Sequence, residues 1–262
     1  MQLPALETIL TAVESGVLTI TLNRPEVLNA VNEQLAADLG EALRFAERSE
    51  EVRCLILTGA GRGFCSGQDL RDRSGGDGPY GDSLRRRYNP IILKLRTIEK
   101  PVIAAVNGVA AGAGCNLALA ADLRIASERV SLIEIFSRIA LIPDSGGTFF
   151  LPRLVGLAKA LELAWTADPV EAAEALRLGL VNRVVPHDEL MSVSTELARH
   201  LAEGPTRGYG LTKRGFNAAL ALPLEAALEY EAHLQTIAGW TADHREGVAA
   251  FFEKRKPKFE GR

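Results

Sequence analysis

Cysteine is scarce in this sequence, and nothing in its spacing joins one cysteine to another. The 262 residues include three cysteines, Cys54, Cys65 and Cys115, which are scattered, odd in number and without a CxxC pair. That usage argues against a disulfide framework and is typical of a reducing compartment. The four histidines form no ligand pattern either, so we expect no metal site.

Long hydrophobic runs and a basic targeting segment are also missing. No window reaches the ~18 uninterrupted apolar residues of a membrane-spanning helix. Glu7 and Glu14 interrupt the apolar stretch that a secretory signal would need. We therefore expect a cytoplasmic protein without a membrane partner. We also expect no nucleic-acid partner, because the net charge is −3 and the basic run at residues 85–87 is too short for a broad basic patch.

Segments typical of strands and of helices alternate through the first two thirds of the chain. Residues 17–22 and 101–106 are apolar runs rich in β-branched residues, whereas residues 33–47 repeat their apolar side chains at helical spacing. Such alternation predicts an α/β fold, and the length is sufficient for a full hydrophobic core. From about Asp188 onward the spacing is helical only.

Two turns rich in small residues suggest a site. Residues 107–114 lead into a helical stretch, and a helix that begins on Gly and Ala exposes free backbone N–H groups at the positive end of its dipole. Such groups can bind an oxyanion. Asp144 lies in the second turn, residues 142–147. Because a nearby carboxylate can move a proton on the carbon beside a polarised carbonyl, the pair of turns predicts enolate chemistry.

Two other candidate motifs give weaker support for a functional site. Residues 58–63 follow a strand, as a dinucleotide-binding loop does, but their glycine spacing is not GxGxxG and no clear helix follows. We therefore expect no dinucleotide site there. Cys65 has no histidine nearby in the sequence, and we interpret it as a small packed residue rather than a nucleophile.

Four motifs carry a resemblance to a known family. They are NRPE at residues 23–26, GFCSGQDL at 63–70, PVIAAVNGVAAGAG at 101–114 and EGVAAFFEKR at 246–255. With these motifs in this order, the chain resembles the enoyl-CoA hydratase/isomerase (crotonase) superfamily over nearly its whole length. The resemblance implies an α/β crotonase fold, a ClpP-like spiral of repeated ββα units in two nearly perpendicular sheets.

The same resemblance implies how the chain is organised and what it binds. Residues 1–195 would form the crotonase core with the CoA and acyl site, and residues 196–262 a C-terminal helical trimerisation region. The expected partners are an acyl-CoA thioester substrate and copies of the same chain, as a homotrimer or homohexamer. No cofactor is expected, because CoA arrives as part of the substrate.

The site residues follow from the family motifs. The two backbone N–H groups that bind the thioester oxygen would be those of Gln68 and Ala113. A further set would contact coenzyme A or the acyl group: Leu28, Ala30, Ser66, Gly67, Asp69, Leu70, Gly112, Asn116, Phe136, Phe251 and Lys254. Lys254 would pair with a CoA phosphate as a point charge, or it would simply lie on a solvated helix face.

The chain departs from the hydratases of the family at the catalytic positions. Where those enzymes carry two glutamates, this sequence has Asn116 and Phe136, and where they carry glycine it has Asp144. Members with the form IPDxGG resemble acyl-CoA isomerases. These include isomerases of the ring-1,2-epoxide of phenylacetyl-CoA and of Δ3,Δ2-enoyl-CoA. The resemblance thus implies that Asp144 transfers the proton. We interpret Glu134, two residues before the second glutamate position, as structural.

Three alternative functions stay open at this point. An enoyl-CoA hydratase would use Asp144 with a bound water. An aromatic acyl-CoA dehalogenase would use Asp144 to attack the ring. An RNA-binding protein of the same fold would belong to another class.

Overall fold

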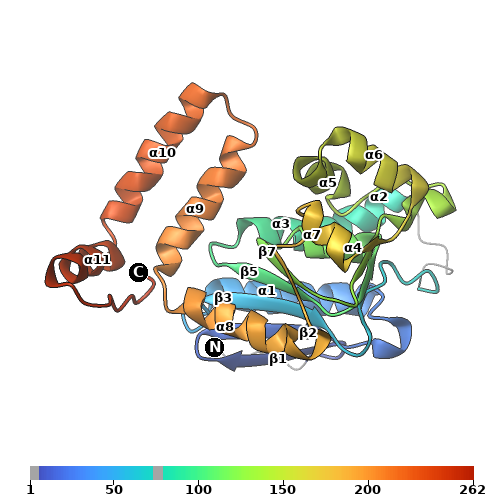
Figure 1. Ribbon diagram of the computed structural model, residues 1–262, viewed down its shortest axis with the longest axis horizontal. Coiled ribbons are helices and arrows are strands. Elements are labelled where there is room, and N and C mark those ends of the chain that lie inside the picture. The colour runs from blue at the N-terminus through green and yellow to red at the C-terminus, as the bar shows by residue number, and fades with distance from the viewer. Residues whose placement is uncertain (1–5, 73–78) are drawn as a thin grey trace.

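Two β-sheets form the centre of the molecule (Figure 1). The computed structural model describes residues 6–72 and 79–262. The larger sheet has six strands, in the order β1 (Ile9–Glu14), β2 (Val17–Leu22), β3 (Cys54–Gly59), β5 (Val102–Val106), β7 (Leu123–Ser127) and β10 (Arg183–Val185). The smaller has four, in the order β4 (Gly63–Cys65), β6 (Val109–Ala111), β8 (Ser131–Ile133) and β9 (Val170–Glu171).

The chain passes from the larger sheet to the smaller one and then into helices, again and again. β3 and β4 are followed by α2 (Tyr80–Ser83), the π-helix η2 (Leu84–Tyr88) and α3 (Asn89–Thr97). β5 and β6 are followed by α4 (Ala113–Leu119). β7 and β8 are followed by the 3-10 turn η3 (Ile135–Ile139), α5 (Gly147–Val155) and α6 (Leu157–Thr166). Successive turns therefore add parallel strands to both sheets, and the expected spiral of ββα units is confirmed.

The first helix illustrates how local sequence sets an element. α1 (Glu33–Arg48) matches the predicted helix over residues 33–47. It begins where the Asn32 side chain accepts a hydrogen bond from the Leu35 N–H at 2.9 Å, which satisfies one of the free donors of the first turn. Its buried face includes Leu35, Leu39 and Leu43, so the apolar spacing of the sequence becomes the contact with the core.

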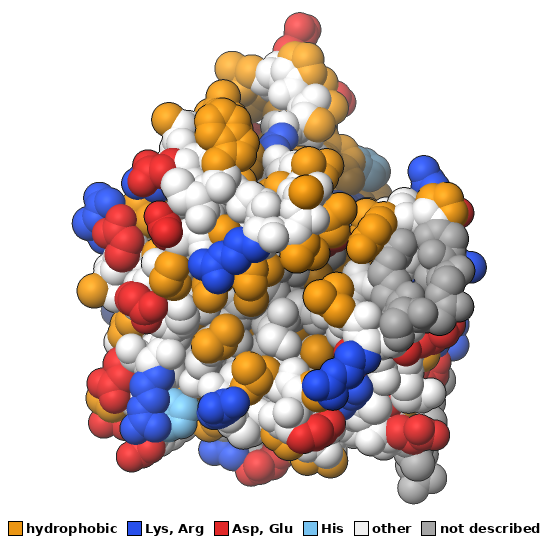
Figure 2. Space-filling view, turned by 90° about the vertical axis from the view of Figure 1, so that its right-hand side faces the viewer, with side chains coloured by type: hydrophobic (Ala, Val, Ile, Leu, Met, Phe, Trp, Pro, Cys, Tyr) orange, Lys and Arg blue, Asp and Glu red, His pale blue; other side chains and the backbone are white. Residues whose placement is uncertain are grey.

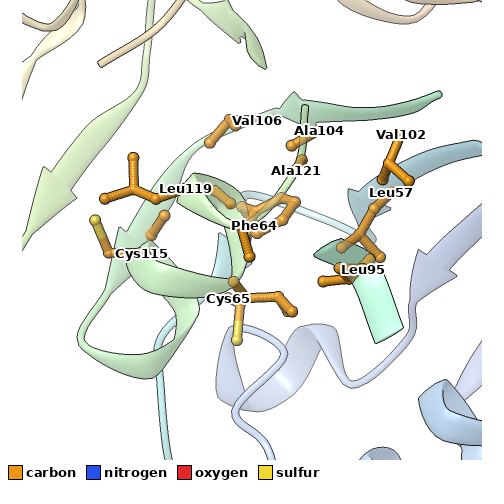
Figure 3. Close-up of a cluster of buried hydrophobic side chains, with 14 of the residues drawn as sticks. Leu57, Phe64, Cys65, Leu95, Val102, Ala104, Val106, Cys115, Leu119 and Ala121 are labelled. Carbon is orange, nitrogen blue, oxygen red and sulfur yellow. The ribbon is translucent and has the colours of Figure 1, made fainter. Parts of the chain in front are cut away.

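The main hydrophobic core includes the end of β4 and the start of α4. In Figure 3, Phe64 and Cys65 lie beside Cys115 and Leu119, and all four side chains are buried. Burial raises the pKa of the Cys65 thiol to about 12. The thiol therefore stays neutral, as the packed-residue interpretation of Cys65 predicts.

The C-terminal part of the described chain consists of helices. α8 (Leu190–Ala202) buries Leu190, Ala198 and Ala202 against β-strand residues such as Ile56 and Ile103 of the larger sheet. Beyond it, α9 (Thr206–Ala219), α10 (Leu224–Gly239) and α11 (Ala242–Glu253) extend away from the sheets (Figure 1). The helical pattern predicted from Asp188 is confirmed. The boundary expected at residue 195 falls inside α8, and the division into two domains stays a prediction.

The remaining short elements are connections: η1 (Pro25–Val27), α7 (Ala172–Arg177) and η4 (His187–Glu189). Across residues 6–72 and 79–262, every helix is too short or too polar to span a membrane.

Candidate active site

The turn after β4 presents one free backbone donor. Gly67 has a φ of +96°, which favours glycine. The Val31 N–H donates to the Gly67 carbonyl at 2.7 Å, and the Asp69 N–H donates to the Val31 carbonyl at 3.0 Å. This parallel bridge uses the groups on either side of Gln68. The Gln68 N–H therefore has no acceptor in the described part of the chain.

The first turn of α4 presents a second free donor. Ala113 is the first residue of this helix, where backbone N–H groups have no intrahelical partner. The preceding N–H, that of Gly112, donates to the Ile133 carbonyl at 2.8 Å, but the Ala113 N–H has no acceptor among residues 6–72 and 79–262. The Ala113 nitrogen lies 3.6 Å from the point that a Cβ on Gly67 would occupy. The two turns are thus adjacent, as an oxyanion site requires.

A close backbone contact fixes the two turns against each other. A Cβ on Gly114 would lie 2.1 Å from the Cys65 carbonyl oxygen. Only glycine at this position lets α4 begin directly against the end of β4.

Asp144 lies in the turn before α5 and is linked to α4 through Asn116. The Asn116 side-chain nitrogen donates to the Asp144 backbone carbonyl at 2.9 Å, and the Ser145 hydroxyl donates to the Asp144 carboxylate at 2.8 Å. Burial raises the pKa of the Asp144 carboxyl above its usual range. The two glycine-rich turns singled out in the sequence are therefore neighbours in the fold. Asp144, in the second of them, is half-buried.

Glu134 is a residue that the sequence analysis set aside as structural, and the structure places it beside this carboxyl. Its side chain is buried, with 3% of its surface exposed. Asn116 also approaches it, with 3.4 Å between the Asn116 nitrogen and a Glu134 carboxylate oxygen. Burial raises the pKa of Glu134 to about 7. A second titratable group thus lies within the site.

Tyr88 is a further residue near Asp144 that was not among the expected site residues, although the segment at residues 86–90 that contains it favours the epoxide isomerase. It ends the π-helix η2, an irregular helix type that is frequent at functional sites. Its hydroxyl is buried and has no hydrogen-bond partner among the described residues. The carboxyl of Asp144 is near enough to act on it electrostatically, and burial raises the pKa of the Tyr88 hydroxyl.

The residues expected to hold the bent coenzyme A chain and its adenine come together at one edge of this site. The Ser66 N–H donates to the Leu28 carbonyl at 2.9 Å. The Arg24 guanidinium donates to both the Ala30 carbonyl and the Asp69 carboxylate, at 2.6 and 2.9 Å. Two segments far apart in sequence are therefore joined at the Gln68 turn. Leu70 follows them and is 56% exposed.

The remaining expected binding residues divide between two places. Phe136 is buried in η3, and its ring lies 3.6 Å from the point that a Cβ on Gly112 would occupy. Phe251 and Lys254 are exposed at the end of α11, which lies across the molecule from α4 (Figure 1). Within a single chain these two residues are not brought to the site. No group of three or more potential metal ligands occurs in the described residues.

Comparison with known proteins gives one consistent family. The profile of the family described as Enoyl-CoA hydratase/isomerase matches residues 12–262. The chain is 48% identical to a protein of Escherichia coli (strain K12) named 1,2-epoxyphenylacetyl-CoA isomerase, covering 98% of this chain and 100% of that protein. It is 46% identical to a probable enoyl-CoA hydratase of Rhodobacter capsulatus, covering 95% and 96% of the two chains.

Solved structures agree with the sequence relatives. The fold superimposes on a crystal structure described as a putative enoyl-CoA hydratase from Streptomyces coelicolor A3(2), with a TM-score of 0.94. The two share 38% sequence identity, and the match covers 100% of this chain and 97% of the other.

Proposed function

Because this chain belongs to the enoyl-CoA hydratase/isomerase family and is an enzyme of that family, we propose that it is an acyl-CoA isomerase that works through a thioester enolate. The observation that carries the proposal is a half-buried carboxyl in a turn that is hydrogen-bonded to α4, the helix that begins at Ala113. Asn116 makes this bond to the Asp144 backbone carbonyl, and the Ala113 N–H is one of the two free donors. The positions of the hydratase glutamates hold Asn116 and Phe136, neither of which exchanges protons near neutral pH.

The two N–H groups would stabilise the enolate. A thioester oxygen placed between Gln68 and Ala113 would accept from both, and negative charge that develops there would also lie at the positive end of α4. Removing a donor of this kind costs about 3–4 kcal/mol at the transition state. The side chains contribute little to this step, because both donors belong to the main chain.

Asp144 would move the proton. In a double-bond shift, one carboxylate takes a proton from one carbon and returns it to another, so a single group suffices. In an epoxide isomerisation, the enolate would assist the C–O rearrangement while Asp144 handles the proton. Burial, which raises the pKa of Asp144, makes it a stronger base than an exposed aspartate. Neither reaction needs a redox or metal cofactor, since CoA belongs to the substrate.

The relative from Escherichia coli supports a specific substrate. Its name states that it acts on 1,2-epoxyphenylacetyl-CoA, and we propose this ring epoxide as the substrate here, with the oxepin isomer as the product. Phenylacetate catabolism would then be the pathway. A Δ3,Δ2-enoyl-CoA of fatty-acid metabolism is a further substrate that the same two groups could isomerise.

Hydration is the second candidate function. The relative from Rhodobacter capsulatus is named a probable enoyl-CoA hydratase, and a water activated by Asp144 would add across a double bond. Hydratases of the family divide this work between two glutamates. Asn116 and Phe136 stand at those positions, which favours isomerisation.

We also propose self-association into trimers, alone or paired as hexamers. The C-terminal helices expose large apolar side chains, among them Phe216, Trp240 and Phe251. Figure 2 shows more apolar side chains on the opposite end of the molecule, the face that carries α5 and α6, where Leu157 and Trp165 are exposed. A neighbouring subunit that covers these surfaces would also give Phe251 and Lys254 a route to bound CoA.

The cytoplasm is the location we propose. All three cysteines are free and buried, which supports a reducing compartment.

A panel of acyl-CoA substrates tests the proposed function. The purified enzyme is assayed with the phenylacetyl-CoA ring epoxide, a 3-enoyl-CoA and crotonyl-CoA, and products are followed by mass and absorbance. We expect turnover of the epoxide, the 3-enoyl-CoA or both without change of mass. Rapid gain of one water by crotonyl-CoA, with neither of the other substrates isomerised, would replace the proposal by a hydratase.

A further inference from the structure

Glu134 and Asp144 are two acidic residues close enough to interact electrostatically, and the Asn116 amide contacts the carboxylate of the first and the backbone carbonyl of the second. Glu134 follows β8 directly, and Asp144 precedes α5. The Asn116 side-chain nitrogen lies 2.9 Å from the Asp144 carbonyl oxygen and 3.4 Å from a Glu134 carboxylate oxygen. Asn116 is fully buried in α4, so the two acidic residues contact one and the same enclosed amide.

Neither carboxyl has a cationic partner among residues 6–72 and 79–262. The second oxygen of Glu134 and the side-chain oxygen of Asn116 are both buried without a hydrogen-bond partner in the described chain. Only 3% of the Glu134 surface is exposed, so water cannot shield its charge. Ionising a buried carboxyl that has neither a cationic partner nor a full set of hydrogen bonds costs free energy, so packing alone does not explain the presence of Glu134.

The other titratable groups around the pair do not neutralise it. From α4, the Cys115 thiol contacts Glu134, and from η2, the Tyr88 hydroxyl is near enough to Asp144 to interact electrostatically. Both are neutral at physiological pH because burial raises the pKa of each. Arg124 is the cation that acts on Cys115, but its guanidinium is bound by backbone carbonyls, including those of Ala121 and Leu180.

We propose that Glu134 is a positioning residue for Asp144, which holds the Asp144 turn in place through Asn116 and sets the proton affinity of Asp144 by its own charge state. Glu134 does not touch the substrate in this account, and it exchanges no proton with it. The inference rests on the proposed role of Asp144 as the proton-transfer group.

Two carboxylates that lie close together repel each other. When Glu134 is neutral, only desolvation raises the pKa of Asp144. When Glu134 loses its proton, near pH 7, a second negative charge is added close by in a poorly screened interior. The Asp144 carboxylate then binds a proton more tightly and becomes a stronger base. Activity should therefore rise as Glu134 ionises.

The test is the pH dependence of kcat/KM for the wild type and for Glu134→Gln, on whichever acyl-CoA the wild type isomerises best. Glutamine keeps the size and the acceptor for Asn116 but cannot ionise. We expect the wild type to gain about threefold or more between pH 6 and pH 8, and Glu134→Gln to show no such rise. Asp38→Asn is the matched control, because Asp38 is a buried carboxyl bonded to Thr8, far from this site in the chain. It should keep the wild-type profile.

A second measurement does not depend on turnover. Infrared difference spectra between pH 6 and pH 8 should show the loss of one protonated carboxyl band, and that loss should also occur in Asp38→Asn. Absence of this band, or an unchanged rise of kcat/KM in a folded Glu134→Gln, would overturn the inference. Failure of the proposed function would be seen differently. If Asp144 does not transfer the proton, Asp144→Asn stays active regardless of the result for Glu134→Gln.

Discussion

At the scale of single residues, the two carboxyl groups of the site differ in how deeply they are buried and in their hydrogen bonds. Asp144 is half-buried and receives a hydrogen bond from the Ser145 hydroxyl, which favours its ionised form. Glu134 is almost fully buried, and its carboxyl is contacted by the Asn116 amide at 3.4 Å and by the Cys115 thiol. Because the better solvated group ionises first, Asp144 would be available as the proposed base while Glu134 still carries its proton.

The charge state of Glu134 also predicts how stability depends on pH. Its pKa is raised from 4.5 to about 7 in the folded protein, so the folded state binds more protons than the unfolded state between these values. The free energy of unfolding must then fall as pH rises through this window, by up to roughly 3 kcal/mol. Glu134→Gln lacks this loss. Urea unfolding at pH 5 and pH 8 should show a smaller decrease for the variant, whereas parallel decreases would refute the pKa shift.

Asp144 could be predicted from the sequence, and the place of Glu134 could not. A charge in a glycine-rich turn, where the family's hydratases have none, marks Asp144. No comparable feature of the sequence distinguishes Glu134. Whether its side chain points into the core depends on whether the alternation of buried and exposed residues in β8 continues past Ile133. In the structure it does, since Leu132 and Glu134 are both buried. A strand of three residues is too short for its period to be read with certainty from sequence.

At the scale of elements, the position of one proposed donor, the Ala113 N–H, is set by where α4 begins. The donors are backbone N–H groups, so side-chain changes that keep the backbone should be tolerated. Proline is also compatible with the first position of a helix, because that N–H has no helical partner and the fixed φ suits the turn. Ala113 occupies this first position.

We therefore predict opposite results for two substitutions at the donors. Ala113→Pro removes the proposed donor and should lower kcat by about 10²–10³-fold, with the helix retained. Gln68→Ala keeps its N–H and should retain most of the activity. Steady-state kinetics with circular dichroism measures both. Normal kcat in a folded Ala113→Pro enzyme would show that this N–H does not stabilise the transition state.

Gly114 gives a second prediction at this scale. A Cβ there would meet the Cys65 carbonyl at 2.1 Å, so Gly114→Ala must push α4 away from β4 and separate the two donors. We expect a loss of stability of about 1–3 kcal/mol, typical of overpacking, together with a fall in kcat. Gly239→Ala is the control, because nothing lies within 4 Å of its added Cβ. Equal melting temperatures and rates for the two variants would contradict the close contact.

The longer elements could be predicted from local pattern, and their assembly could not. The β-branched run of β2 and the apolar spacing of α1 each identify an element. The division into two sheets rests on β4, β6 and β8, which have three residues each and show no readable period. It was expected only through the family resemblance.

At the scale of the whole molecule, the distribution of apolar surface indicates self-association. A monomer in water rarely exposes several large apolar side chains on one group of helices. Here Leu224 and Trp240, at the two ends of α10, are each 75% exposed. Burying such side chains between subunits would remove a large apolar area from water.

Sedimentation equilibrium at micromolar concentration tests this prediction. We expect a mass three or six times the 28.2 kDa of one chain. Trp240→Glu should shift the distribution toward smaller species, because it places a charge in the proposed interface. A wild-type protein that sediments as a monomer would contradict the trimer and would also leave Phe251 and Lys254 without a route to CoA.

The central claim is that Asp144 transfers the proton, and the most direct test is kcat of Asp144→Asn on the acyl-CoA that the wild type isomerises best. Asparagine keeps the size and the turn but cannot act as a base. We predict a fall of at least about a hundredfold, the usual scale of general acid–base catalysis, with acyl-CoA affinity little changed and Asp38→Asn near wild type. A well-folded Asp144→Asn enzyme with kcat close to that of the wild type would contradict the account and would make Glu134 the base to test next.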